Sequence, residues 1–395
     1  MTTLTATLSH FANPAAAARD ELYPARLAEI TSLEKSLEAR DIISRWPGYA
    51  PTPLLSLDAL AAKIGVADIL YKDESRRFHL KSFKALGGAY AVARQLQQAI
   101  ARETGETVGI EDLLERRYPS VVEKIVISCA TDGNHGRSVA WGCQMFGCGC
   151  VIYIHRDVSE GRQQAMESFG AKVVRIPGNY DDSVKLAASE AESHGRIIVS
   201  DTSYPGYMDI PRDVALGYTV MLAEAVEQMQ GSRPTHVFIQ AGVGGLASAV
   251  CAYFWELWGA TRPRFVVVEP EQANCLQQSA RRGEPVTVEG DLETLMAGLS
   301  CGEVSLLAWE ILKPGADDFM TVSEDAVGAC MRLLARGEHA IEAGESAVAG
   351  LAAAIAARED PEMSARLGLG ADSSIFVIGT EGATDPEVYR ELVEA

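Results

Sequence analysis

The residue whose type and position most clearly suggest chemistry is Lys84, which directly follows Phe83 where a helix is predicted to begin. Ser82 is of a type that favours a helix N-cap, and apolar residues recur at helical spacing up to about Leu96. A helix dipole disfavours a cation in the first turn and so favours an amine that is neutral or forms an imine. Lys84 is therefore the leading candidate for amine chemistry, with a surface lysine or a role for Lys81 as alternatives.

A first glycine-containing loop follows the predicted strand 124–128 and reads Ala130-Thr131-Asp132-Gly133-Asn134-His135-Gly136. Its glycines suit a tight turn into a helix, whose N-terminal N–H groups attract carboxylates or phosphates. The charge of Asp132 would compete with such an anion. Asp132 is therefore either a helix N-cap or a residue with a function of its own.

A second loop lies between a predicted strand and an apolar helix and reads Gln240-Ala241-Gly242-Val243-Gly244-Gly245-Leu246-Ala247. Backbone N–H groups in such a loop can bind a phosphate. The loop also fits the pattern G-x-G-x-x-A, and Glu269 ends the next predicted strand, where a dinucleotide site needs a ribose-binding acid. A nicotinamide dinucleotide, another phosphate ligand and a purely structural turn all remain open here.

Composition excludes several classes of partner. The chain has 395 residues and a net charge of −19, with 47% hydrophobic and 23% charged residues. No basic stripe offsets this charge, which argues against nucleic acid and anionic membrane surfaces. No run approaches the roughly 18 apolar residues of a membrane span, and the first residues lack the features of a signal peptide. We expect a cytoplasmic globular protein.

The eight cysteines are scattered, without C-x-x-C pairs or a histidine-rich neighbourhood. The closest pair in the sequence is Cys148 and Cys150. We therefore expect buried thiols in a reducing compartment and no metal site.

The predicted elements give an α/β protein of two lobes. Residues 1–47 are expected to form a helix-rich lead-in, 51–55 an extended segment and 107–120 an irregular excursion. Strands and helices then alternate, which is typical of parallel sheets covered by helices. The predicted strands are 69–74, 124–128, 150–154, 172–176, 197–199, 236–240, 264–269 and 374–379. The predicted helices are 136–146, 160–169, 180–193, one from about 217, 246–258 and 272–279.

A lysine at a helix start, a Gly-Asn loop and a phosphate loop are the parts that pyridoxal phosphate requires. Their order resembles the tryptophan-synthase-β and threonine-dehydratase type of enzyme, the fold type II pyridoxal-phosphate enzymes. The resemblance implies a large cofactor-binding domain of residues 1–85 and 222–395 and a small domain of residues 86–221. It implies that Lys84 is the Schiff-base lysine, next to Phe83, and that Asn134 contacts the ring hydroxyl. The residues implied to hold the phosphate are Gly242, Val243, Gly244, Gly245 and Leu246.

A narrower resemblance covers about Tyr49 to the C-terminus. The motifs that carry it are Lys72-Asp73-Glu74-Ser75, Phe83 to Tyr90, Thr131 to Arg137, Asn179 to Asp182, Gln240 to Gly244, Met296 to Leu299, Gly344-Glu345-Ser346 and Thr380-Glu381-Gly382. Together they resemble the diaminopropionate ammonia-lyase family, in which Asp132 replaces a small residue of related dehydratases. The resemblance implies that Asp132 and Asp201 are catalytic, that Thr380 faces the pyridine nitrogen and that the protein is a homodimer. It places Ala130, Thr131, Asp132 and His135 around an amino-acid substrate.

The implied reaction is the elimination of ammonia from 2,3-diaminopropionate, which gives pyruvate and a second ammonia. An amine must leave as ammonium, and a carboxylate beside it can hold that cation and manage its proton. A neutral Thr380 at the ring nitrogen favours elimination over transamination. We hypothesise that Lys84 and Asp132 take the α-proton from the L and D isomers respectively.

Two features depart from the family pattern. The family carries an uncharged stretch where this chain has His79-Leu80-Lys81, which either faces solvent or favours a substrate with a second carboxylate. Cys275 and Cys301 match positions where the family can carry cysteines, and we expect them to be reduced. The alternatives are a serine, threonine or 3-hydroxyaspartate dehydratase, a β-replacement enzyme, an NAD-dependent dehydrogenase and a non-catalytic binding protein.

Overall fold

The computed structural model describes residues 4–290 and 292–394, and the chain divides into two units. Unit 1 consists of Met1–Leu33, Pro51–Lys81 and Met221–Ala395, and unit 2 of Glu34–Ala50 and Ser82–Val220. Relative to the division predicted from the sequence, residues 34–50 and 82–85 fall in unit 2 and Met221 falls in unit 1. The assignment of one unit as the large cofactor-binding domain and the other as the small domain stays a prediction.

Unit 1 contains a seven-stranded sheet in the order β1-β10-β9-β8-β11-β3-β2. The five inner strands run parallel, and the edge strands β1 and β2 pair antiparallel with their neighbours. The strands are β1 (Leu8–Ala12), β2 (Leu54–Ser56), β3 (Asp68–Asp73), β8 (His236–Gln240), β9 (Arg264–Pro270), β10 (Asp318–Val322) and β11 (Ser374–Gly379). The inner strands are almost entirely buried because helices cover both faces of a parallel sheet.

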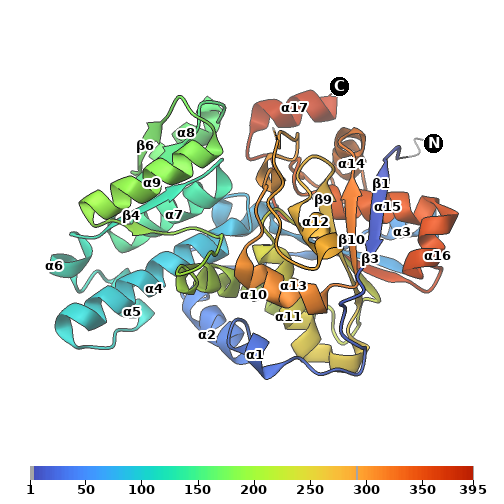
Figure 1. Cartoon of the computed structure of the whole chain (residues 1–395), viewed down its shortest axis with the longest axis horizontal. Coiled ribbons are helices and arrows are strands. Elements are labelled where there is room, and N and C mark those ends of the chain that lie inside the picture. Colours follow the sequence, from blue (N-terminus) through green and yellow to red (C-terminus); the bar gives the residue numbers. More distant parts are fainter. Residues whose placement is uncertain (1–3, 291, 395) are drawn as a thin grey trace. The chain divides into compact units, whose positions relative to one another are not determined.

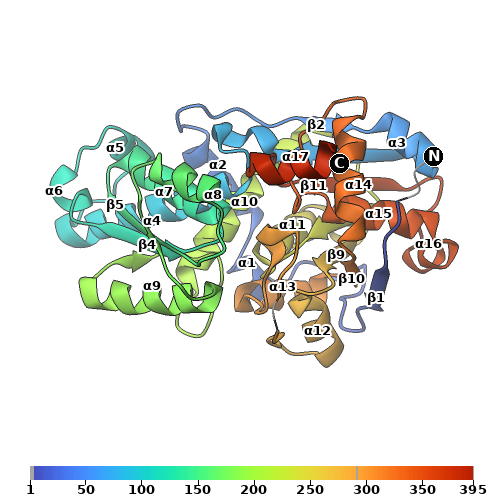
Figure 2. The same cartoon turned by 90° about the horizontal axis from the view of Figure 1, so that it is seen from above.

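Helix α15 (Ala349–Glu359) packs against β8, β9, β10 and β11, while α12 (Cys275–Arg282) contacts β1 and β10 (Figures 1 and 2). A Cβ at Gly350 would lie 2.6 Å from the Phe238 carbonyl, so this glycine allows the close approach of α15. The other helices of unit 1 are α1 (Ala25–Ala28), α3 (Asp58–Ile64), η1 (Glu74–His79), α11 (Gly245–Trp258), η2 (Gly259–Thr261), η3 (Ala297–Leu299), α13 (Leu306–Gly315), α14 (Asp325–Ala335), α16 (Pro361–Leu367) and α17 (Pro386–Glu394).

Unit 2 contains a parallel four-stranded sheet in the order β6-β5-β4-β7. Helix α9 lies against one face, and α7 lies against the other with α4 packed on it (Figure 2). The strands are β4 (Val126–Ala130), β5 (Gly149–Ile154), β6 (Lys172–Arg175) and β7 (Ile197–Ile198). The helices are α2 (Leu33–Ile43), α4 (Lys84–Thr104), α5 (Ile110–Leu114), α6 (Pro119–Val122), α7 (Asn134–Phe146), α8 (Glu160–Glu167), α9 (Tyr180–His194) and α10 (Asp209–Gln228), the last of which continues into unit 1.

The predicted class, an α/β protein with mostly parallel sheets flanked by helices, is confirmed. Strands 236–240 and 374–379 have the predicted bounds. Two predictions were wrong in part: the lead-in contains the edge strand β1 beside helices α1 and α2, and the stretch 107–120 contains α5 and the start of α6. Strand β10 was not predicted. Among the described helices, none is both long and apolar enough to cross a membrane.

Candidate active site

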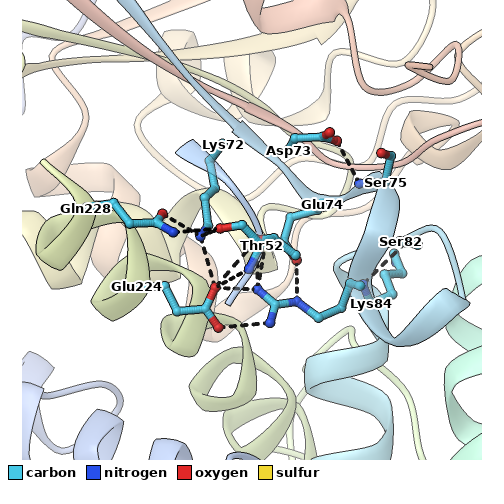
Figure 3. Close-up of polar contacts among 10 residues, drawn as sticks. Thr52, Lys72, Asp73, Glu74, Ser75, Ser82, Lys84, Glu224 and Gln228 are labelled. Carbon is cyan, nitrogen blue, oxygen red and sulfur yellow. Dashed lines mark hydrogen bonds and ion pairs between the residues drawn. The ribbon is translucent and has the colours of Figure 1, made fainter. Parts of the chain in front are cut away.

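Lys84 is the first residue of α4, and the position before it belongs to Phe83, whose side chain cannot cap the helix. Ser82 supplies the capping contact instead, because its Oγ accepts a hydrogen bond from the Lys84 N–H at 3.3 Å (Figure 3). The Phe83 ring is buried and packs on Tyr218 with ring centroids 4.7 Å apart. Lys84 is thus held at a fixed point of the helix, one residue after the predicted helix start.

Helix α4 is fastened to α7 directly beside Lys84. The Ser138 hydroxyl donates to the Lys84 carbonyl at 2.6 Å and its oxygen accepts from the Ala89 N–H at 3.2 Å. A Cβ at Gly88 would lie 2.5 Å from the same hydroxyl, so only glycine lets the two helices approach this closely. The lysine and the Gly-Asn loop at the start of α7 therefore belong to one rigid helix pair.

The Lys84 amine lies 2.5 Å from Asp201 Oδ2, and both side chains are about four-fifths buried. Burial by itself would raise the pKa of Asp201, but the Lys84 ammonium and then His135 outweigh it and hold that pKa well below its ordinary value. An adjacent carboxylate favours the charged form of an amine. This contact therefore corrects the inference from the helix dipole, which favoured a neutral amine at Lys84.

His135 lies in the same cluster, with Nδ1 3.9 Å from Asp201 Oδ2. Its Nε2 lies 2.8 Å from the Val199 carbonyl, which can only accept, so Nε2 carries the proton. Burial lowers the pKa of His135, and Nδ1 has no hydrogen-bond partner among the described residues. A buried acceptor beside an amine and a carboxylate fits a site that takes an ammonium-bearing ligand.

Asp132 does not cap α7. The N-cap position is Gly133, and the Thr131 Oγ1 accepts the N–H groups of Gly133 and Gly136, each at 3.1 Å. Of the two interpretations of Asp132 that the sequence left open, the capping one is therefore wrong. Ala130 ends β4, and Asn134 is the first residue of α7.

The Asp132 carboxylate contacts His155, a residue that the sequence analysis did not single out. Their Nε2 and Oδ1 atoms lie 2.9 Å apart. A usable signal was present, since His155 directly follows the predicted strand 150–154. Polar residues that follow neighbouring parallel strands meet at one edge of the sheet.

In unit 1 the second loop enters α11 through Gly244, whose φ of +97° strongly favours glycine. A Cβ at Gly242 would lie 2.9 Å from Cys301 Sγ. Gly244, the N-cap residue of α11, has no side chain that could cap the helix. The first N–H groups of the helix, from Gly245 and Leu246 onwards, have no intrahelical acceptor. This N-terminus fits the phosphate of pyridoxal phosphate.

The buried Thr380 follows β11, and its hydroxyl oxygen accepts from Gln240 Nε2 at 3.0 Å. The same amide nitrogen lies 2.8 Å from the Ile378 carbonyl and 3.2 Å from the Ala347 carbonyl, which can only accept. The orientation of the Gln240 amide is therefore fixed. The Thr380 hydroxyl keeps its own hydrogen for another acceptor, which fits an unprotonated pyridine nitrogen.

Glu269, the acid on which the dinucleotide interpretation depended, is fully buried, and its carboxyl oxygens already accept hydrogen bonds. Its two carboxyl oxygens accept the N–H groups of Leu276 and Gln277 at 2.7 and 2.8 Å, at the start of α12. Burial raises the pKa of Glu269 to about 8. A carboxyl group used in this way is not available to a ribose.

The two departures from the family pattern lie in unit 1. His79 is exposed, and the Lys81 amine pairs with Glu342 at 2.7 Å, where both side chains are nearly half exposed. This contact favours the solvent-facing interpretation of Lys81. Among the described residues, Cys275 and Cys301 are not joined in a disulfide. Within residues 4–290 and 292–394, no group of three or more His, Cys, Asp or Glu side chains is arranged to hold a metal ion.

A buried network of charges supports β3 and η1 in unit 1 (Figure 3). Glu224 accepts from Lys72 Nζ at 2.9 Å and from two guanidinium nitrogens of Arg77 at 2.7 and 2.8 Å. Arg77 also donates twice to Glu74 at 2.8 Å. All four side chains are essentially inaccessible to solvent, so two cations and two anions balance inside the unit.

The sequence pattern of the family described as "Pyridoxal-phosphate dependent enzyme" matches residues 45–378. The chain is 38% identical over 384 residues to the diaminopropionate ammonia-lyase of Escherichia coli (strain K12), which covers 95% of both proteins. A crystal structure of the Escherichia coli lyase in complex with D-serine superposes with a TM-score of 0.90, at 36% identity, over 99% of this chain and 98% of that one. A second, in complex with an aminoacrylate-PLP azomethine reaction intermediate, has a TM-score of 0.88 at 36% identity, over the same shares of the two chains.

The likeness extends over nearly the full length of both proteins and is far above the level at which only a fold is shared. It also accounts for the lysine helix, the Gly-Asn loop and the phosphate loop together, which the dehydrogenase and binding-protein interpretations do not. The chain belongs to the pyridoxal-phosphate dependent enzymes, and within them to the family of diaminopropionate ammonia-lyases.

Proposed function

We propose that this enzyme eliminates ammonia from 2,3-diaminopropionate and releases pyruvate and a second ammonia. The single observation that carries the proposal is that the Asp132 carboxylate does not cap a helix although it lies in the loop before α7. Its carboxylate is spared from capping by Thr131, and it lies in the loop that opens α7, the helix fastened to the start of α4 at Lys84. An amino-acid dehydratase has no cationic leaving group for such a carboxylate to hold, whereas an ammonia-lyase has one.

The residues of this chain fit pyridoxal phosphate at each of its functional groups. Lys84 would hold the aldehyde, Asn134 the ring hydroxyl and Thr380 the ring nitrogen. The loop Gly242 to Leu246 would hold the phosphate. When bound, the cofactor withdraws electrons from the α-carbon of the amino acid and makes the α-proton acidic.

The chain's own groups then supply the proton transfers. The Lys84 amine can take the α-proton only when it is not held as an ammonium, so Asp201 sets how readily it acts. Asp132 holds the β-ammonium group of the substrate or takes the α-proton at its carboxylate. The Nδ1 of His135, which has no hydrogen-bond partner within residues 4–290 and 292–394, can accept an N–H of the substrate. These roles are proposals for Lys84, Asp132, Asp201 and His135, with Thr131 and Ala130 shaping the same loop.

The test is formation of the 2-oxo acid by the protein loaded with pyridoxal phosphate. This acid is pyruvate from diaminopropionate and serine, and oxaloacetate from 3-hydroxyaspartate. D- and L-2,3-diaminopropionate, L-serine and 3-hydroxyaspartate are offered separately. Pyruvate from the diamino acid, at a kcat/KM well above that for either hydroxy acid, supports the proposal. A preference for a hydroxy acid would establish the dehydratase alternative instead.

Serine is the second candidate substrate, because a solved relative was crystallised with D-serine. D-serine therefore belongs in the substrate series as a further arm. We also propose a homodimer in the cytoplasm as the working state of the enzyme. The mass of the loaded enzyme in solution, measured by light scattering, tests whether it is a homodimer.

A further inference from the structure

His155 and Asp132 are level with each other at the ends of two neighbouring strands. Ala130 of β4 and Tyr153 of β5 are register partners, and each of the two polar residues lies two positions further along. The Thr131 N–H donates to the Tyr153 carbonyl at 3.1 Å, which keeps the strand ends together. The contact of 2.9 Å between Nε2 and Oδ1 therefore follows from the sheet register.

The ring of His155 is held in one orientation. The Asp157 N–H lies 3.3 Å from Nδ1 and can only donate, so the neutral ring carries its proton on Nε2 and donates it to Asp132. Arg175, at the end of β6, holds the chain after β5 by donating to the carbonyls of His155 and Val158 at 3.4 and 2.6 Å. These contacts hold the His155 ring so that its Nε2–H donates to Asp132.

Charged groups from several elements face this imidazole. Among the described residues they are Asp132, Asp157 with Oδ2 3.6 Å from Nδ1, Arg156 on Asp157, Arg162 of α8 on the Asp132 carbonyl, and Arg175. The hydrogen bond to Asp132 raises the pKa of His155, against an opposing effect of burial. His155 donates to Asp132 whether it is neutral or charged.

We propose that His155 is the positioning residue of Asp132: it binds Oδ1 and leaves Oδ2 to hold or move the substrate's proton. The proposal rests on the proposed function and on the hypothesis that Asp132 takes the α-proton of the D isomer. A carboxylate takes a proton from carbon only when it is correctly placed. Lys84 has Asp201 as its own partner. The loss of His155 should therefore lower activity on the D isomer, which depends on Asp132, and leave activity on the L isomer.

The test compares three variants of the loaded enzyme with D- and L-2,3-diaminopropionate as probes. His155→Phe removes the donor, and His155→Gln keeps an N–H donor without the charge. His194→Phe is the matched control, because His194 also faces an acid in unit 2, Glu190, but lies on the exposed face of α9. The kcat and the KM are measured for each isomer.

For His155→Phe we expect kcat/KM for the D isomer to fall about 10- to 100-fold, the loss of one hydrogen bond to a charged group. The loss should fall on kcat rather than on KM, while the L isomer is little changed. His155→Gln should recover part of the D rate. His194→Phe should leave both isomers as they were. Equal losses for the two isomers, or a change in KM alone, overturn the proposal.

A readout independent of turnover is the imidazole titration of His155, followed by NMR of the loaded enzyme with labelled histidine. His155→Gln assigns the signal. Asp132→Asn should lower the titration midpoint of His155, and an unchanged midpoint overturns the pairing. Failure of the proposed function looks different, because the unsubstituted enzyme would then form no pyruvate from either diamino acid. If His155→Phe does not fold, the kinetics of His155→Gln and the NMR titration of His155 test the proposal instead.

Discussion

The Lys84 amine lies 2.5 Å from the Asp201 carboxylate, and this pair places an ionised acid beside the lysine that we propose to bind the cofactor. The lysine comes from the start of a helix and the acid from the segment after β7, more than a hundred residues later. The pair gives Lys84 a counter-charge that the first turn of α4 does not provide. Its consequences can be measured in catalysis and in stability.

Replacing Lys84 by Ala should lower kcat/KM for both isomers by about 10³-fold or more. The change removes the amine proposed to bind the cofactor's aldehyde and, with it, a proton acceptor. Borohydride treatment of the unsubstituted enzyme should label Lys84 in peptide mass spectra, and the variant should carry no label. Lys81→Ala is the control. It should keep nearly full activity, because Lys81 pairs with Glu342 at the surface; a loss as large as that of Lys84→Ala would revive Lys81 as the functional lysine.

Replacing Asp132 by Asn should remove activity on the D isomer far more than on the L isomer, by about 10²- to 10⁴-fold if the carboxylate is the acid/base for that isomer alone. Parallel assays of pyruvate from the two isomers check this. The helix cap should be unaffected, because Thr131 provides it. Equal losses for both isomers would mean that the two bases are not divided between the two faces of the substrate.

Replacing Asp201 by Asn should make unfolding less sensitive to acid. The pKa of Asp201 is depressed in the folded chain, so its ion pair contributes stability above the ordinary aspartate pKa, near 4, and loses it as pH falls below that value. Urea unfolding at pH 6 and pH 3 should show a smaller loss for the variant than for the unsubstituted protein. Asp209→Asn, at an exposed position of α10, is the control and should lose as much as the unsubstituted protein.

Glu269 should change the free energy of unfolding with pH in the opposite direction to Asp201. Burial raises its pKa to about 8, so the folded chain binds this proton more tightly than the unfolded chain, and stability falls as pH rises from about 4.5 towards 8. Glu269→Gln should remove this dependence. The difference in unfolding free energy between the two proteins should therefore be larger at pH 5 than at pH 8.5, and an equal difference at both pH values would contradict the assignment.

Replacing Arg77 by Met should cost about 3–5 kcal/mol, because Glu224 and Glu74 would keep buried charges without their main partner. Denaturant unfolding measures the loss. The matched control is Arg26→Met, which breaks an exposed pair with Glu310 and should cost no more than about 1 kcal/mol. Similar losses for the two variants would show that the buried network is not a principal support of unit 1.

Much of the candidate site was open to prediction because its signals are local. A lysine after Phe83, glycines around Asn134 and the loop at Gly242 each act through the backbone conformation of a few residues. The alternation of strands and helices is local as well, and strands such as 236–240 and 374–379 were placed correctly. The family resemblance rests on the same short motifs, which is why the class, the cofactor and the reaction family followed from the sequence.

The tertiary structure decided which groups meet. Strands β1 and β10 were not predicted, although they pair with each other at the edge of the unit 1 sheet. The dinucleotide interpretation failed because Glu269 caps α12, and the partners of Lys84 and Asp132 depend on where β7 and β5 lie beside β4. Sequence spacing fixes what each turn can offer, but strand order and register bring distant side chains within hydrogen-bond reach, and these depend on the packing of the whole sheet.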